Sequence, residues 1–329
     1  MKEFGSDFHF YIDDDYNNKQ FTSKQYRFYS CGRQAIQHLI KIRNWKRIWI
    51  PEFFCYEIIE AINSTGIEIR LYQDAPTLDD KLIIQNLEFE LNDVLLRMNF
   101  FGLRIFRDNS KIPIEVIEDH SHDLFGNWAK NSNADWCIAS LRKTLPLPEG
   151  GILWSPKKHN LPDTIGSSFE NENLANKRLN AMLLKKLYLS NLISSKELYR
   201  QLYFETEEAF SSLNINSISK ISFTLLNKIN TKEWYRKKKE NWNYLSTSLK
   251  NSFKILTLED KEICEPFSLI IQFENQTERD YFNRKLIENN VFPAILWKIP
   301  NNSNIISKEI SNSLLSIHCD ARYNKAVIK

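Results

Sequence analysis

Short apolar runs alternate with amphipathic segments through the first half of the chain. The apolar runs, rich in Ile, Val and Trp, occupy residues 47–51, 67–72, 93–102, 114–119 and 135–140. Their length and composition are typical of buried strands. Between the first two runs, residues 55–66 place apolar side chains at helical spacing. The rhythm of strand, helix and strand predicts an α/β domain with a mostly parallel sheet.

The second half has a different pattern. Residues 167–250 contain no glycine and carry apolar positions at helical spacing among Leu, Lys, Glu and Asn, so we expect mainly helices there. From about residue 262 the chain shows a strand-like run at 267–273, a charged helix at 278–290 and two further apolar runs at 291–300 and 313–319. This order predicts a small α+β domain at the C-terminal end.

The glycines also separate the two halves. All eight lie at or before Gly166, so the second half has no residue that adopts positive φ at little cost. We therefore expect a large domain at residues 1–230 and a small one at residues 231–329, with an uncertainty of about ten residues at the boundary.

Charge and hydropathy exclude several classes of protein. The 329 residues include 44 Lys and Arg against 41 Asp and Glu, a net charge of +3 that does not by itself favour a nucleic-acid partner. The one basic run, Arg236 to Lys239, is flanked by Glu233 and Glu240 and is typical of a solvated helix face. No stretch approaches about 18 uninterrupted apolar residues, which argues against a membrane span.

The N-terminal residues and the cysteines bear on location. The first fifteen residues have neither a basic start nor an apolar stretch, so we expect no cleaved secretion signal. The five cysteines are widely scattered and form no C-x-x-C pair. We interpret them as reduced thiols in a cytoplasmic protein.

Residues 27–42 contain the first candidate for a functional site. A polar turn with Gly32 leads into an apolar-periodic helix. A helix that begins at a glycine presents free backbone N–H groups and its positive dipole end, which suit a phosphate group. Taken alone, Gly32 is better explained as a turn residue.

Residues 114–126 contain the second candidate. An apolar strand ends in Glu118 and Asp119, and two histidines, His120 and His122, follow. Open α/β sheets bind their ligands at the carboxyl ends of parallel strands. A metal bound by His120, His122 and Asp123 has suitable ligand types but lacks a recognisable partner elsewhere in the chain, so we predict no metal.

Residues 135–154 contain the third candidate. A strand ends at Ser140, Lys143 follows, and Pro146 and Pro148 stiffen the turn that closes on Gly150 and Gly151. A lysine after a buried strand is a candidate for a desolvated amine, the form that condenses with a carbonyl group. The alternative is a solvated surface lysine, which is the usual place for this residue.

The order of these three segments resembles that of pyridoxal-phosphate enzymes of fold type I, and within them the DegT/StrS group of sugar aminotransferases. Eight motifs follow one another in the order of that family across nearly the whole chain. They are EFGSDF (3–8), YSCGRQAI (29–36), IPEFFCYEIIEAINSTGIEIRLYQD (50–74), FFG (100–102), EDHSHDLFG (118–126), SLRKTLPLPEGG (140–151), RKKKENWNYLSTSL (236–249) and SIHCDARYN (316–324).

The resemblance implies an α/β fold of type I: a large domain with a seven-stranded, mostly parallel mixed sheet between helices, and a small α+β C-terminal domain. It implies pyridoxal 5′-phosphate as the cofactor. Lys143 is then the residue that binds the cofactor covalently and moves the proton, and Asp119 pairs with the pyridine nitrogen.

The resemblance also implies a phosphate site and a neighbour for the cofactor ring. Gly32 and Arg33 would offer backbone N–H groups to the phosphate, and Ser140 its hydroxyl. His122 stands where the family usually has Gln, near the phenolic oxygen of the cofactor.

Two positions depart from the family pattern. The residue that is aromatic in many members and stacks on the cofactor ring is Cys55 here, so stacking is either absent or supplied by Phe54 or Tyr56. Ser140 lies three residues before Lys143, whereas sugar aminotransferases often have it five before.

The leading hypothesis is a homodimeric aminotransferase that moves an amino group from glutamate to a keto sugar nucleotide or a related metabolite, in the synthesis of cell-surface polysaccharide. The presence of Lys143 argues against the related dehydratases, which have His at that position. A fold type I homologue that has lost catalysis and serves as a binding or assembly subunit is the alternative. A hydrolase that uses Cys55 with His122 has the residue types but no recognisable nucleophile motif.

Overall fold

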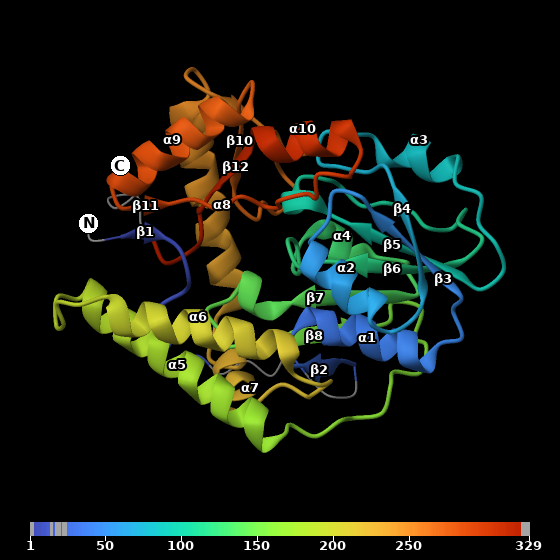
Figure 1. Ribbon diagram of the computed structural model, residues 1–329, viewed down its shortest axis with the longest axis horizontal. Coiled ribbons are helices and arrows are strands. Elements are labelled where there is room, and N and C mark those ends of the chain that lie inside the picture. Colours follow the sequence, from blue (N-terminus) through green and yellow to red (C-terminus); the bar gives the residue numbers. More distant parts are fainter. Residues whose placement is uncertain (1–2, 14–15, 17–20, 22–24, 324–329) are drawn as a thin grey trace.

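A seven-stranded sheet forms the centre of the computed structural model, which describes residues 3–13, 16, 21 and 25–323 (Figure 1). The strand order is β2-β8-β7-β6-β5-β3-β4. The strands are β2 (Arg27–Tyr29), β3 (Arg47–Pro51), β4 (Glu68–Tyr72), β5 (Asp93–Met98), β6 (Glu115–Asp119), β7 (Trp136–Ser140) and β8 (Gly151–Trp154). Each of the five apolar runs of the first half contains one of them, so these strand predictions are confirmed.

Five neighbouring strands of the sheet, from β7 to β4, run parallel, and β8 lies antiparallel between β7 and β2. The sheet is therefore mixed and mostly parallel, as expected. In the register of the parallel pairs, Met98 lies beside Asp119, and Asp119 lies beside Ile138. The carboxyl ends of β5, β6 and β7 thus meet at one edge of the sheet.

Helices connect the strands of the first half. They are α1 (Gly32–Ile42), α2 (Tyr56–Asn63), α3 (Asp80–Gln85) and α4 (Asn127–Asn131), with short 3-10 turns η1 (Phe100–Gly102) and η2 (Leu141–Lys143). On α1 the buried positions include Ala35, Ile36, Leu39 and Ile40, which recur at helical spacing and pack into the core.

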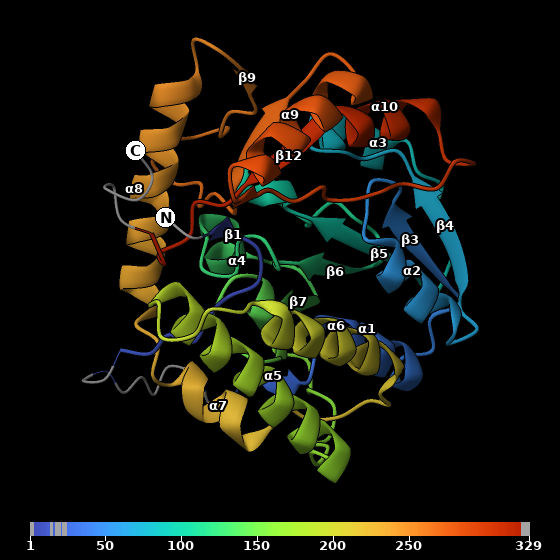
Figure 2. The same ribbon diagram turned by 60° about the vertical axis from the view of Figure 1, so that its left-hand side comes forward.

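Four helices fill the glycine-free region, as its pattern predicts. They are α5 (Phe169–Leu189), α6 (Glu197–Ser212), α7 (Lys220–Leu226) and α8 (Thr231–Leu249). Three of them begin at a residue whose side chain accepts a hydrogen bond from the first turn, namely Ser168, Ser219 and Asn230. Helices α5 and α6 form a long antiparallel hairpin, and α6 runs past α1 (Figure 2).

The C-terminal part adds a small three-stranded antiparallel sheet of order β12-β10-β9, and two helices. Its elements are β9 (Lys254–Ile255), β10 (Leu269–Gln272), α9 (Gln276–Glu288), α10 (Ile305–Ser313) and β12 (Leu314–Ile317). Of the apolar run at 291–300, only β11 (Val291–Phe292) is a strand, and it pairs in parallel with β1 (Phe4–Gly5). Asn324, the last residue of the C-terminal motif, lies outside the described residues.

One hydrophobic core runs through both expected domains. The same cluster of buried residues contains Ile48 and Ile138 from the large sheet, Trp242 from α8, and Leu269 and Leu315 from the small sheet. The division at residue 230 stays a prediction. It coincides with the start of α8 at Thr231, but apolar packing continues across it.

Other expectations can be compared with these coordinates. All five cysteines are buried, free thiols. None of the described helices is long and apolar enough to cross a membrane. The basic run on α8 differs from a solvated face, because Lys238 is buried and its ammonium lies 4.3 Å from the centre of the Tyr235 ring.

Gly102 gives a first testable prediction. It has φ of +68°, and a Cβ atom there would lie 2.0 Å from the carbonyl oxygen of Glu265. Gly66 has φ of +82° but no atom within 4 Å of its Cβ position. We expect Gly102→Ala to lower the free energy of unfolding by about 1–3 kcal/mol more than Gly66→Ala, because only the first adds overpacking to backbone strain. Urea unfolding of both variants measures this difference, and equal losses would contradict the close approach at Gly102.

Candidate active site

A cleft of about 670 Å³ lies where the large sheet, the α5–α6 hairpin and the C-terminal part meet. Cys55, His122 and Lys143, all predicted site residues, line it. Phe267 and Trp297 of the C-terminal part add aromatic surface, and Glu207 and basic residues of the hairpin add charge. The cleft therefore gathers groups from sequence segments more than 200 residues apart.

Lys143 ends the short turn η2, three residues after the last residue of β7. Its ammonium group lies 5.5 Å from the centre of the Trp297 ring. Two hydrogen bonds hold the next residue in place: the Thr144 hydroxyl donates to the carbonyl of Ser121 (3.0 Å), and the indole of Trp234 donates to the carbonyl of Thr144 (3.0 Å). The backbone that carries the amine is thus fixed by the loop after β6 and by α8.

Asp119 is the last residue of β6 and is 2% exposed. Its carboxylate accepts a hydrogen bond from the backbone N–H of Ser121 at 2.8 Å. Since β6 and β7 are neighbouring parallel strands, Asp119 and the segment from Ser140 to Lys143 follow adjacent strand ends. This is the edge at which open α/β sheets place their ligands.

The expected phosphate site is closely packed. A Cβ atom on Gly32, the first residue of α1, would lie 3.2 Å from the backbone nitrogen of Ser140. A Cβ atom on Gly151 would lie 2.3 Å from the carbonyl carbon of Cys31. No side chain caps the N-terminus of α1. The structure therefore brings Gly32, Arg33 and Ser140 together around a helix start whose N–H groups suit an anion.

His122 is buried in a stack of aromatic rings. Its imidazole lies 4.1 Å from the ring of Phe267 and 5.4 Å from that of Trp297, within about 21° of parallel to both. The backbone N–H of Phe101 donates to Nδ1 (3.1 Å). Burial, together with the positive charges of Lys143 and Lys238, holds the pKa of His122 well below its usual value. The ring is therefore neutral, with its proton on Nε2.

Cys55 and the two aromatic residues that could replace it in stacking, Phe54 and Tyr56, have different surroundings. Cys55 lines the cleft. Phe54 is fully buried and packs against Trp297 at 6.0 Å. The Tyr56 hydroxyl is hydrogen-bonded to that of Ser303 (2.9 Å), and Tyr56 does not line the cleft. Of the two aromatic alternatives to Cys55, neither contributes to the cleft wall.

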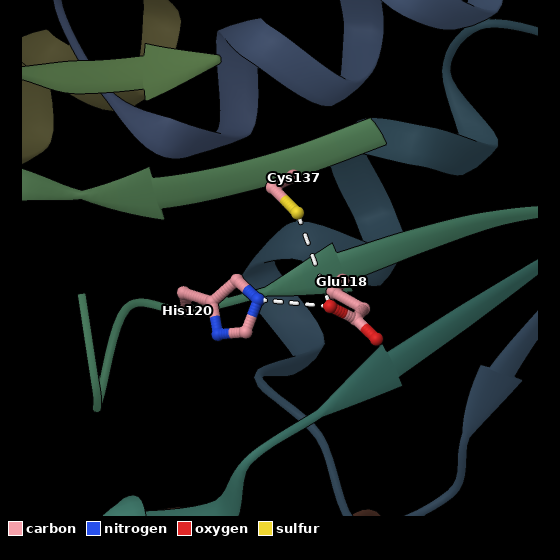
Figure 3. A group of neighbouring side chains, drawn as sticks. All are labelled: Glu118, His120 and Cys137. Atoms are coloured by element: carbon pink, nitrogen blue, oxygen red, sulfur yellow. Dashed lines mark hydrogen bonds and ion pairs between the residues drawn. The ribbon is translucent and has the colours of Figure 1, made fainter. Parts of the chain in front are cut away.

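His120 lies in a buried cluster with Glu118 and Cys137, none of which lines the cleft (Figure 3). Its Nε2 is hydrogen-bonded to Glu118 (3.0 Å) and its Nδ1 to Asp123 (2.8 Å), and the Cys137 thiol is close to Glu118. Burial alone would lower the pKa of His120, but the neighbouring Asp123 charge and the hydrogen bonds raise it well above its usual value. The imidazole is therefore an imidazolium between two carboxylates.

These contacts bear on the metal hypothesis. Among the described residues, Glu118, His120 and Cys137 are the one group with side-chain atoms close enough to share an ion. Both nitrogens of His120 are already used in hydrogen bonds to carboxylates. His122 lies in the aromatic stack instead, so the structure does not bring His120, His122 and Asp123 together as ligands.

Comparison with solved structures gives the fold a name. The chain aligns with a DegT/DnrJ/EryC1/StrS aminotransferase of Brucella abortus at TM-score 0.61 and 13% identity, over 92% of this chain and 83% of that one. It aligns with Spr1654 of Streptococcus pneumoniae, named as a sugar aminotransferase, at TM-score 0.64 and 11% identity, over 93% and 85%. The chain has the aminotransferase fold of type I.

A third neighbour agrees. DesV of S. venezuelae aligns at TM-score 0.62 and 12% identity, over 92% of this chain and 81% of that chain. No family model and no curated protein matches the sequence. The type I fold is thus recognised through the arrangement of its elements, and at this identity the likeness establishes the fold alone.

Sequence reasoning missed several residues of the cleft. Trp297 lies in an apolar run that gave no sign of facing a ligand. Arg142 directly precedes Lys143, and nothing in the local sequence distinguishes it from a surface arginine. Arg178 lies on the same face of α5 as the buried Ala175 and Met182 and is 6% exposed, but its charge favoured a surface position. The burial of a charged side chain on a helix can be predicted only when its partners are known.

Proposed function

We propose that this protein is a pyridoxal 5′-phosphate-dependent aminotransferase. The observation that carries the proposal is that Lys143, three residues after the end of β7, lines the same cleft as Cys55 and His122. Asp119 ends the neighbouring parallel strand β6. The Brucella abortus and Streptococcus pneumoniae structures that share its fold are named as aminotransferases, and Spr1654 was solved in a form that contains the cofactor. These observations support the assignment of the cofactor and of the amino-transfer reaction.

The residues present fit the cofactor. Gly32 packs tightly against the Ser140 backbone, so the uncapped start of α1 lies against a serine residue, and helix-start N–H groups together with a serine hydroxyl are a donor set suited to a phosphate. Asp119 is a buried carboxylate, as pairing with a protonated pyridine nitrogen requires. When bound, pyridoxal 5′-phosphate supplies an electron sink that acidifies the carbon bearing the amino group.

Each residue then has a task. With the cofactor bound, Lys143 would hold it through its amine, and the same amine would carry the proton of the substrate carbon. The negative charge of Asp119 keeps the pyridine nitrogen protonated. His122, neutral and with its proton on Nε2, can donate a hydrogen bond without adding positive charge beside Lys143. The ring of Trp297 lies 5.5 Å from the ammonium group of Lys143 and provides an aromatic surface beside it.

The substrate class follows less directly. We propose glutamate as amino donor and a keto sugar nucleotide or related metabolite as acceptor, in cell-surface polysaccharide synthesis. Spr1654 is named as a sugar aminotransferase, and the Brucella abortus protein as a DegT/DnrJ/EryC1/StrS aminotransferase. We also propose a homodimer, and the five free thiols support a reducing compartment such as the cytoplasm.

The test is the absorption spectrum of the purified protein with added pyridoxal 5′-phosphate, before and after borohydride. We expect a visible band that borohydride removes, and a cofactor mass fixed on Lys143 when the peptides are analysed. The experiment does not depend on knowing the acceptor. A protein that takes up no reducible cofactor would overturn the aminotransferase assignment and favour a non-catalytic binding or assembly subunit.

The hydrolase hypothesis receives no comparable support. Cys55 and His122 both line the cleft, but no hydrogen bond joins these two described residues. The imidazole nitrogen Nδ1 already accepts from the Phe101 backbone, and the ring is held by stacking on Phe267. A general base for a thiol needs a free nitrogen within hydrogen-bond reach of the sulfur.

A further inference from the structure

Two arginines of the cleft wall converge on one carboxylate. Arg142 donates two hydrogen bonds to Glu207, at 2.8 and 2.5 Å. Arg178 donates a third to the same carboxylate at 3.2 Å. All three residues line the cleft that also contains Lys143. They come from three elements, since Arg142 belongs to η2, Arg178 to α5 and Glu207 to α6.

Arg178 is fixed independently of Glu207. Its other terminal nitrogen donates to the carbonyl of Tyr203 (2.8 Å) and to the hydroxyl of Thr206 (2.9 Å). The guanidinium group lies over the ring of Tyr203 at 4.5 Å. Asp7 adds one hydrogen bond of 3.2 Å from the side of the N-terminal segment. The guanidinium is therefore held in one orientation, with the edge that bonds Glu207 turned toward the cleft.

Glu207 is more exposed to solvent than its two arginine partners. Its side chain is 45% exposed, against 7% for that of Arg178 and 21% for that of Arg142. Burial alone would raise the pKa of Glu207, but Arg142 and then Arg178 and Arg33 lower it to about 2, so the group is an anion throughout the physiological range. Because the carboxylate reaches water on one side, a ligand oxyanion can approach from the cleft and replace its hydrogen bonds to both arginines with equivalent ones.

We propose that Arg142 and Arg178 form a binding site for an oxyanion of a ligand, and that the Glu207 carboxylate occupies this site until the ligand displaces it. This inference rests on the proposed function only for the identity of the ligand. Arg142 and Lys143 line the same cleft, so an anion held by Arg142 shares that cleft with the reacting amine. The shared chemistry is a carboxylate or a phosphate, and two ligands of the proposed reaction carry one: the amino donor and the cofactor.

The proposal predicts that Glu207 competes with added anions. We would measure binding of glutarate and of inorganic phosphate, separately, by titration calorimetry on the protein without cofactor. Glu207→Gln removes the competing charge and keeps the size of the side chain, so we expect it to tighten binding by about fivefold. Arg142→Gln is expected to weaken binding by at least that factor, because it removes the two-point contact with an oxyanion.

Glu205 offers a matched control on the same helix. It forms an ion pair with Lys177 of α5, as Glu207 does with Arg178, but it does not line the cleft. Glu205→Gln is therefore expected to leave the affinity for both anions unchanged. If Glu207→Gln binds neither anion more tightly than the wild type or Glu205→Gln, the displacement proposal is overturned.

Comparing anions identifies the source of the oxyanion. If glutarate alone binds more tightly to Glu207→Gln, the site holds a carboxylate of the amino donor. If phosphate also binds more tightly, and the affinity for pyridoxal 5′-phosphate rises while that for pyridoxal does not, the site holds the phosphate of the cofactor. These titrations use no catalysis, so they remain informative if borohydride trapping on Lys143 fails, and the two proposals can be rejected separately.

Discussion

Lys143→Ala is expected to abolish the covalent attachment of pyridoxal 5′-phosphate and to lower the rate of amino transfer from glutamate by about 10²–10⁴-fold or more. The variant lacks both the amine that binds the cofactor and the base that moves the substrate proton, and a positioned base alone contributes a factor of this size. The rate is measured as the change in cofactor absorbance after glutamate is added in a single turnover.

The matched control is Lys196→Ala. Lys196 lies at the start of α6 and lines the same cleft, so it tests whether any lysine of the cleft serves. We expect this variant to retain the borohydride-reducible link on Lys143. A Lys143→Ala protein that still forms a reducible link, or that transfers amino groups at the wild-type rate, would show that another residue holds the cofactor.

The second large effect is expected on stability. Replacing His120 with Gln removes the imidazolium that lies between Glu118 and Asp123, at hydrogen-bond distances of 3.0 and 2.8 Å. Both carboxylates are about 1% exposed and remain buried when the positive charge is gone. Breaking a buried charge pair by removing one partner costs about 3–5 kcal/mol, and we expect a loss of this size in the free energy of unfolding.

This loss should depend on pH in one direction. The pKa of His120 in the folded protein is raised well above 6.5, the value of an unperturbed histidine, so the folded state binds the proton more tightly than the unfolded state. The stabilisation is fully present below about pH 6.5 and decreases as the pH rises through the raised value. The difference between wild type and His120→Gln should therefore be largest near pH 6 and smaller under alkaline conditions.

His159 provides the control for this measurement. It is hydrogen-bonded to Asp135 at 2.9 Å, but its side chain is 36% exposed. We expect His159→Gln to cost about 1 kcal/mol or less, as is usual for exposed pairs. Urea unfolding of the three proteins between pH 6 and pH 9 gives both the size and the pH dependence. If His120→Gln lowers the free energy of unfolding by no more than His159→Gln does, the charges of the two buried carboxylates are compensated by groups other than His120.

The sequence was most informative where buried strands produce uninterrupted apolar runs. Residues 47–51 and 135–140, for example, correspond closely to β3 and β7. The helical character of residues 167–250 was equally clear, because that region lacks glycine and is periodic. Where the chain needed positive φ in the second half it used Asn191 and Asn290, which tolerate that conformation better than most residues.

Side-chain partners could not be predicted in the same way. Nothing local indicates that Arg142 bonds Glu207, 65 positions later, or that Lys238 in a basic run turns inward. The placement of His120 has the same origin: its two carboxylate partners lie within three residues, but only the fold buries all of them. Motifs thus predict Lys143 and Asp119 as site residues, whereas the positions of the charged side chains around the cleft depend on helix packing that local sequence does not encode.

The pairing of β1 with β11 has a consequence for protein synthesis. Phe4 and Gly5 lie beside Val291 and Phe292, and the Phe4 ring stacks on Tyr323 at 4.1 Å. Phe4 and Gly5 are therefore synthesised long before their partners in β11, and they stay unpaired until β11 has been made. Because Glu3, Ser6 and Asp7 line the cleft, the nascent chain cannot complete this wall of the ligand site before β11 has been synthesised.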